Sequence, residues 1–261
     1  MEFIIGVDCD GVACAVGEPG KSLSFSRDYD RARRQATREA DAAARALYDA
    51  GADHVIVWDN HGGGMNLEYH RLDPRCEIAL GAGFAHRWPG LRGHFAGVLM
   101  VGYHAMENAP GGVLAHTYSP RAYAHFAVND QTVGEIALDA AVAGDRSVPV
   151  IFVSSDDKGC DEAERFLPWT ERVCTKRGHA GHAAVSLSPE RAAETVYAGV
   201  RRAVARLEGM QTFRFPPPIR MKVRYKSPLT ALKTRLRGRG WRLAGLQTVR
   251  RTFDSLADWQ C

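Results

Sequence analysis

The stretch FIIGVDCDGV, residues 3–12, decides the fold, because an apolar run ends there at two aspartates, Asp8 and Asp10. Side chains two residues apart on a β-strand point to the same face, so both carboxylates should aim at one spot, with Cys9 turned away. Burying two unpaired anions costs several kcal/mol, which predicts a positive partner between them, most simply a metal ion. The alternative is a strand end where Asp and Gly only form a turn.

Strands and helices alternate in the sequence that follows this stretch. Apolar strands are predicted at residues 3–8, 54–61, 95–105, 123–130 and 148–155, and amphipathic helices at 28–51, 133–144 and 188–209. Such alternation predicts an α/β fold, a mostly parallel sheet with helices on both faces in a three-layer sandwich.

Three prolines in the stretch FPPPIR, residues 215–220, interrupt this alternation. They cannot continue a helix or occupy a central strand, so we expect a linker. The chain then divides into a catalytic domain over 1–213 and a small basic α+β appendage over 219–261. The appendage is predicted to hold a strand at 220–225, a helix beginning near Ser227 and a strand-like segment at 241–253.

Size and composition restrict the class of protein. A chain of 261 residues with 45% hydrophobic and 25% charged residues is globular and can fill a sizeable core. No apolar run approaches the length that spans a membrane, and the first residues lack the basic start of a signal peptide. The six cysteines form no C-x-x-C pair. We therefore expect free thiols and a cytoplasmic location.

The net charge of +4 conceals an asymmetry. Residues 209–253 hold twelve Lys and Arg and no Asp or Glu, whereas the remaining 22 Lys and Arg stand against 30 Asp and Glu, a net charge of −8. A basic tail on an acidic body can pack on a neighbouring subunit, bind nucleic acid or remain a solvated surface. Few aromatic residues are available to stack on bases, so a nucleic-acid partner is not expected.

Six polar residues follow the predicted strands. Five directly end a strand or open the next helix, namely Asp8, Asp10, His61, His104 and Glu135, and the sixth, His116, lies in a loop. Ligands of parallel sheets bind beyond the carboxyl ends of the strands, so one sheet edge can gather all six. Each residue alone has an ordinary interpretation, such as a surface histidine or an acid at a helix start.

The chemistry of this set points to metal. Carboxylates and neutral imidazoles suit zinc, with manganese or cobalt as substitutes. Three carboxylates and two histidines exceed the needs of one tetrahedral zinc and suit two ions about 3.5–4 Å apart that share a carboxylate. In that arrangement Asp8 bridges the ions and Asp10 binds one of them. Six further histidines, at 54, 86, 94, 125, 179 and 182, are expected outside the site. Residues 179–182, HAGH, are interpreted as a turn before a helix.

Several blocks of the sequence resemble the DppA-type D-aminopeptidases, zinc peptidases named from a dipeptide-transport operon. The blocks are GVDCDGV, VWDNHGG, LMVGYHA, LAHTYS and VNDQTVGE, and the match spans about residues 3–200. The resemblance implies Asp8, Asp10, His61, His104 and Glu135 as ligands of two zinc ions per subunit and His116 as the catalytic histidine. It also implies large ring-like homo-oligomers with active sites facing an internal cavity. Asp10 departs from the family, which more usually has Glu there.

A second enzyme class shares two of these features. FIIGVDCDGVA and the later VIFVSSDDKGCD, residues 150–161, also look like motifs of haloacid-dehalogenase-type phosphatases. Asp8 is then the nucleophile, Asp10 a general acid, and Asp156 or Asp157 a ligand of magnesium. This alternative leaves the three histidines and Glu135 without a task.

The predicted function is metal-assisted hydrolysis of the N-terminal residue of short peptides or amino-acid amides. A hydroxide held by two ions attacks the scissile carbonyl, and His116 moves a proton to the leaving amine or acts as a nucleophile. Selectivity for D-residues rests on the resemblance alone, so an L-aminopeptidase, an amidase and an esterase stay open.

Overall fold

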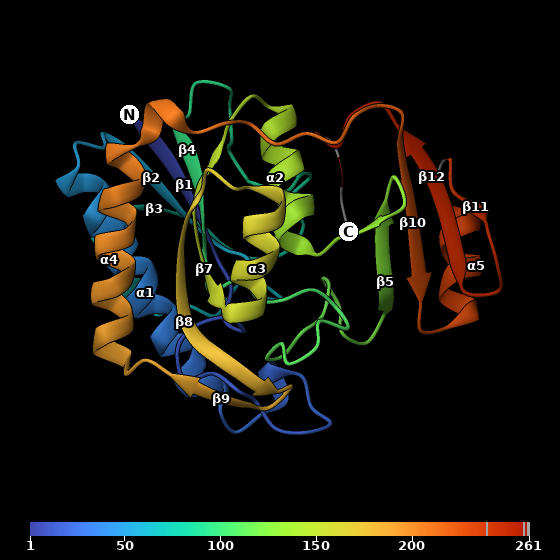
Figure 1. Ribbon diagram of the computed structural model, residues 1–261, viewed down its shortest axis with the longest axis horizontal. Helices are drawn as coiled ribbons and strands as arrows, with labels where there is room; N and C mark the ends of the chain where they lie inside the picture. The colour runs from blue at the N-terminus through green and yellow to red at the C-terminus, as the bar shows by residue number, and fades with distance from the viewer. Residues whose placement is uncertain (239, 258, 260–261) are drawn as a thin grey trace.

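The computed structural model describes residues 1–238, 240–257 and 259, and its centre is a seven-stranded sheet (Figure 1). The strand order is β3-β2-β1-β4-β7-β8-β9, and every neighbouring pair is parallel except β8 and β9. The strands are β1 (Glu2–Val7), β2 (His54–Asp59), β3 (Glu77–Ala79), β4 (Gly97–Val101), β7 (Val150–Asp156), β8 (Glu171–Ala180) and β9 (Ala183–Ser186). The prediction of a mostly parallel sheet is confirmed.

Helices cover both faces of this sheet, as Figure 1 shows. On one face lie α1 (Tyr29–Asp49) and α4 (Pro189–Ala205), and on the other α2 (Glu135–Asp145) and α3 (Asp157–Phe166). Alternate residues of β1 belong to different cores, Ile4 to the α2 side and Phe3 and Ile5 to the α1 side. A strand buried on both faces reads as a continuous apolar run, which explains the first residues of the sequence.

A second, five-stranded sheet lies beside α2, in the order β11-β12-β10-β5-β6. It comprises β5 (Tyr123–Val128), β6 (Gln131–Thr132), β10 (Ile219–Tyr225), β11 (Arg242–Leu243) and β12 (Thr248–Phe253), and α5 (Pro228–Arg237) packs on it. The sequence alternation suggested that segment 123–130 joins the parallel sheet, and this is wrong. Asn129 and Asp130 have φ values of 49° and 64°, which is the geometry of a tight hairpin turn, so the chain folds back instead of crossing over.

The C-terminal segment shares its core with the rest of the chain. Ile219, Val249, Leu256 and Trp259 belong to the same apolar cluster as the residues of α2. The division into domains 1–213 and 219–261 stays a prediction, and the pairing of β10 with β5 joins the two parts through backbone hydrogen bonds.

Some local structure was not anticipated. The short helices η1 (Leu23–Phe25), η2 (Tyr69–Arg71) and η3 (Leu207–Gly209), and α3, β3, β8 and β9, have no counterpart in the sequence prediction. The predicted turn at 179–182 is partly strand, because His179 lies in β8. The five described cysteines are free thiols, and Cys261 lies outside the described residues. Within the described ranges, no helix combines the length and apolar character needed to cross a membrane.

Candidate metal centre

The first two carboxylates of the site follow β1, an interior strand of the sheet, where the chain passes close to the end of β4. The Gly11 amide donates to the Gly102 carbonyl at 2.8 Å, and a Cβ at Gly11 would lie 1.6 Å from the Tyr103 carbonyl oxygen. Only glycine allows this approach. It holds Asp8 and Asp10, exposed by 4% and 3%, against the loop that carries His104.

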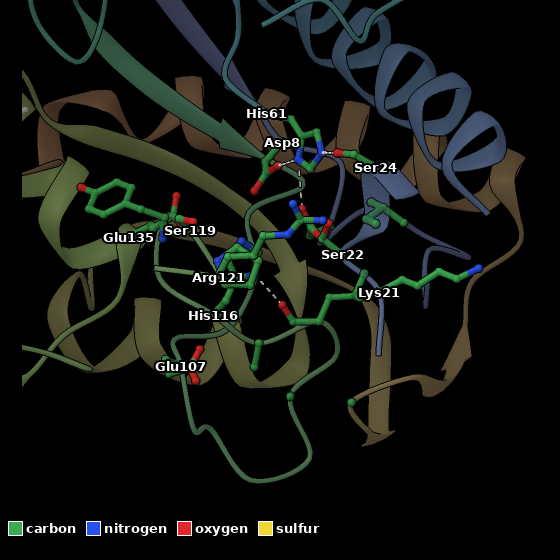
Figure 2. A pocket seen from close by; sticks show the side chains of 18 of the residues that line it. Asp8, Lys21, Ser22, Ser24, His61, Glu107, His116, Ser119, Arg121 and Glu135 are labelled. Carbon is green, nitrogen blue, oxygen red and sulfur yellow. Dashed lines mark hydrogen bonds and ion pairs between the residues drawn. The ribbon is translucent and has the colours of Figure 1, made fainter. Parts of the chain in front are cut away.

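His61 follows β2 and lies beside Asp8, as Figure 2 shows. Its Nδ1 lies 2.7 Å from Asp8 Oδ1 and 3.0 Å from Asp10 Oδ2, and its Nε2 lies 2.9 Å from Ser24 Oγ. The hydroxyl of Ser24 can accept the Nε2 proton, which leaves the Nδ1 lone pair facing the carboxylates. Such outer contacts are what fix the tautomer of a metal-binding histidine.

His104 and Glu135 lie on the other side of Asp8. His104 Nε2 is 3.3 Å from Asp8 Oδ2 and 3.2 Å from Glu135 Oε1, and its Nδ1 donates to the Ala105 carbonyl at 3.0 Å. Glu135 opens α2, and the backbone amide of Tyr118 donates to its Oε1. The Nε2 lone pair of His104 therefore also faces carboxylates.

His116 stacks on His104, with ring centroids 3.9 Å apart and an angle of 10° between the planes. Its Nδ1 donates to the Leu114 carbonyl at 2.7 Å, which leaves Nε2 available, and the side chain lines the cavity in front of the cluster. The structure thus brings all six predicted residues together. They form two groups of possible ligands, Asp8, Asp10 and His61 in one, and His104, His116 and Glu135 in the other.

Charges within the cluster are strongly coupled. Burial alone would raise the pKa of Asp10 and of Glu135, yet His61 beside Asp10 holds the pKa of that carboxyl well below its usual range, and His104 lowers the pKa of Glu135 to about 2. Despite burial, the carboxylates raise the pKa of His61 well above its usual value and that of His104 to about 10. Without a bound cation, these raised pKa values favour a proton on the imidazole nitrogens that face the carboxylates, and a metal ion that binds there would release it.

Two buried atoms support the fit to a metal. Asp10 Oδ2 and His104 Nε2 make no hydrogen bond, although each lies within 3.3 Å of an oppositely charged group. Buried polar atoms are normally satisfied, and atoms left without a partner at the centre of a ligand cluster suit coordination. The cluster opens into a cavity of about 780 Å³, within the range that small ligands occupy.

Comparison with known proteins identifies the family. A family model described as D-aminopeptidase matches residues 1–259. The chain belongs to the D-aminopeptidase family. A D-aminopeptidase of Bacillus subtilis (strain 168) is 34% identical over 197 residues, which is 74% of this chain and 69% of the relative. The solved structure of the Zn-dependent D-aminopeptidase DppA from Bacillus subtilis, described as a self-compartmentalizing protease, matches with a TM-score of 0.91 and 27% identity, over 99% of this chain and 93% of that one.

Family membership confirms the predicted enzyme class, a metallo-aminopeptidase, and gives no support to the phosphatase alternative. The geometry also disfavours a phosphatase, because Asp156 and Asp157 accept hydrogen bonds from backbone amides outside the ligand cluster. Asp156 caps α3 through the Gly159 amide at 2.8 Å and accepts from Val113 at 2.7 Å, while Asp157 accepts from Gly178 at 2.7 Å. Asp156 thereby holds the loop that leads to His116.

Several residues of this D-aminopeptidase family member support the ligands although no sequence pattern predicted them. Asp59 accepts both the backbone and side-chain amides of Asn66, and the Asn66 side chain donates to the His61 carbonyl at 2.6 Å. The position of Asp59, two residues before His61, is the sequence signal that could have identified it. Lys176 is buried, and its Nζ donates to the carbonyls of Asp10, Val12 and Ala15. No local pattern places Lys176 there, because it lies 166 residues from Asp10.

A third supporting group lies one turn along α2 from Glu135. Asp139 is fully buried and pairs with Arg87, and it also accepts the hydroxyls of Tyr103 and Tyr118. Tyr118 is the residue whose backbone amide contacts Glu135. The network therefore fixes both the helix and the loop that meet at this carboxylate.

Proposed function

We propose that this protein is a zinc-dependent aminopeptidase that releases the N-terminal D-residue of short peptides and amino-acid amides. The observation that carries this is the buried cluster of three carboxylates and three imidazoles at the mouth of a cavity, in a chain of the D-aminopeptidase family. Zinc follows from the donor set and from the Zn-dependent relative, with manganese or cobalt as substitutes.

Two ions per subunit account best for the ligands. In this proposal Asp10 and His61 would hold one ion, His104 and Glu135 would hold the other, and Asp8 would contribute a ligand to both. The contacts of Asp8 support the bridge, since Oδ1 lies 2.7 Å from His61 Nδ1 and Oδ2 lies 3.3 Å from His104 Nε2. Zinc, when bound, polarises the scissile carbonyl and makes hydroxide available near neutral pH.

The residues of the chain supply orientation and proton transfer. His116 is held at Nδ1 by the Leu114 carbonyl, so Nε2 can deliver a proton to the leaving amine. Ser24 and the Ala105 carbonyl set the tautomers of His61 and His104.

Assembly into a ring-like homo-oligomer, in the cytoplasm, is part of the same proposal. The solved relative is described as self-compartmentalizing. In this chain α5 exposes Leu229, Leu232 and Leu236, a stripe along one face of the helix, within the basic segment. We infer that a second copy covers this stripe, because residues 209–253 are basic and the rest of each copy is acidic.

Metal analysis paired with one hydrolysis assay tests the proposed function. The zinc-loaded protein should hydrolyse D-alaninamide faster than L-alaninamide, chelation should abolish the activity, and zinc should restore it. Faster hydrolysis of the L-amide would contradict the stereochemical part of the proposal. Hydrolysis that survives complete removal of metal would contradict the metallopeptidase itself.

A further inference from the structure

Arg121 stands at the rim of the cavity with its guanidinium carbon over an aromatic ring. Its Cζ lies 4.6 Å from the ring centroid of Phe25, and both residues line the cavity. Figure 2 draws Arg121 between His116 and Ser22. Phe25 follows Ser24, whose hydroxyl touches His61. The cation therefore faces the same space as the ligand cluster.

The backbone around Arg121 is held in place. The amides of Ala122 and Tyr123 donate to the Ser119 carbonyl at 3.1 and 3.0 Å, closing a turn around Arg121. From the end of β10, the Lys226 amide donates to Ala122 at 2.9 Å and its Nζ donates to Pro120 at 2.7 Å. The C-terminal segment thus braces the turn that presents Arg121.

Arg121 has no acidic partner among residues 1–238, 240–257 and 259. The acidic side chains that line the cavity, and Lys21, each lie near a partner of opposite charge. Lys21 pairs with Glu18 at 3.2 Å, and Glu107 lies 3.5 Å from Lys226. Asp8, Asp10 and Glu135 face imidazoles. The guanidinium that lies over Phe25 carries a planar fork of N–H donors, and such a fork can bind a carboxylate through two hydrogen bonds.

We propose that Arg121 binds the C-terminal carboxylate of the substrate, so that the enzyme prefers short peptides with a free carboxylate over their amides. This rests on the proposed function, which places the N-terminal residue at the metal cluster. A short peptide carries its anion at the opposite end, where this chain offers an unpaired cation. Arg121 is then a specificity residue for peptide length as well as for charge.

The test uses the peptides D-Ala-(Gly)n, with one to four glycines, each as the free acid and as the C-terminal amide. The full-length zinc-loaded enzyme should prefer the acid at least 10-fold in kcat/KM at one length. Arg121→Gln should lower kcat/KM for that acid about 10- to 100-fold, mainly through KM, because a hydrogen-bonded ion pair is lost. Hydrolysis of the amides and of D-alaninamide should change less than about 3-fold.

Two further variants sharpen the result. Arg121→Lys should keep part of the preference, since it retains the charge but not the fork. Lys21→Gln, the matched control at another cation that lines the cavity, should leave the ratio of acid to amide unchanged.

Equal losses for acid and amide in Arg121→Gln would overturn the proposal about Arg121, and so would a parent enzyme with no preference for the acid. In either case, hydrolysis of D-alaninamide by the parent enzyme would still support the proposed function. A smaller particle in light scattering for Arg121→Gln would also overturn it, by assigning Arg121 to a subunit contact. Failure of the parent enzyme to hydrolyse any of these compounds would overturn both proposals.

Discussion

The carboxyl edge of the parallel sheet and the five-stranded sheet both carry many charged residues, but they hold them differently. At the parallel edge, Asp8, Asp10 and Glu135 are at most 6% exposed and touch imidazoles. On β10, charged residues alternate with buried apolar ones, and Arg220, Lys222 and Arg224 all face solvent.

This difference shows that buried charged side chains are better guides to a functional site than exposed ones. Buried charges must be paired at close range, so their geometry is defined and their loss is costly. Exposed charges are screened by water and contribute little to one fixed structure.

His116 should show the largest effect on turnover. We expect His116→Ala to lower kcat about 10²- to 10⁴-fold, the usual cost of a lost acid–base group, while zinc content stays as in the parent. Activity on D-alaninamide and metal analysis of the same sample check this. Loss of zinc would make His116 a ligand instead, and near-normal turnover would remove it from the site.

Glu39 is a further buried acid near the carboxyl edge of the parallel sheet, where it contacts the loop after Asp10. It is fully buried in α1, its Oε1 accepts the Ala13 amide at 2.9 Å, and its Oε2 has no hydrogen bond. Burial raises the pKa of Glu39 to about 7. Because this value lies above that of the unfolded chain, 4.5, the resulting stabilisation is present at low pH and is lost as pH rises from about 4.5 to 7.

Glu39→Gln should therefore stabilise the protein at pH 8 and much less at pH 5. The expected gain in unfolding free energy is at most roughly 3 kcal/mol at pH 8 and below about 1 kcal/mol at pH 5. Chemical denaturation of parent and variant at both pH values measures the difference. A gain of the same size at both would show that it comes from packing and not from ionisation.

The five-stranded sheet should yield the smallest effect on the active site. Leu232 and Leu236 on α5 are 43% and 72% exposed. Changing both to Lys should shrink the particle in light scattering without lowering zinc content, because a subunit contact is lost far from the ligands. Leu80→Lys, at an exposed leucine after β3, is the matched control and should keep the parent size. An unchanged particle in the double variant would exclude α5 from the assembly.

The site residues could be predicted from the sequence where a buried strand of known direction ends at a polar residue. The run ending at Asp8 and Asp10, and the histidines after the next strands, can be predicted because parallel strands end at one edge. The strand over 123–128 was placed in the wrong sheet, because its partner β10 lies about ninety residues later and only the Asn129–Asp130 turn hints at a hairpin. Lys176 and Asp139 were missed, because their partners come from distant segments.

Zinc stoichiometry of the parent and of Asp8→Ala tests the central claim most directly, that the buried strand-end carboxylates hold a two-ion site. We predict close to two zinc ions per chain in the parent. Asp8→Ala should hold neither, because the proposed bridge contacts both ligand groups. Asp157→Ala, a carboxylate outside the cluster, should retain both. Two ions retained in Asp8→Ala would contradict the role of Asp8 as the shared ligand, and only one ion in the parent would contradict the two-ion site.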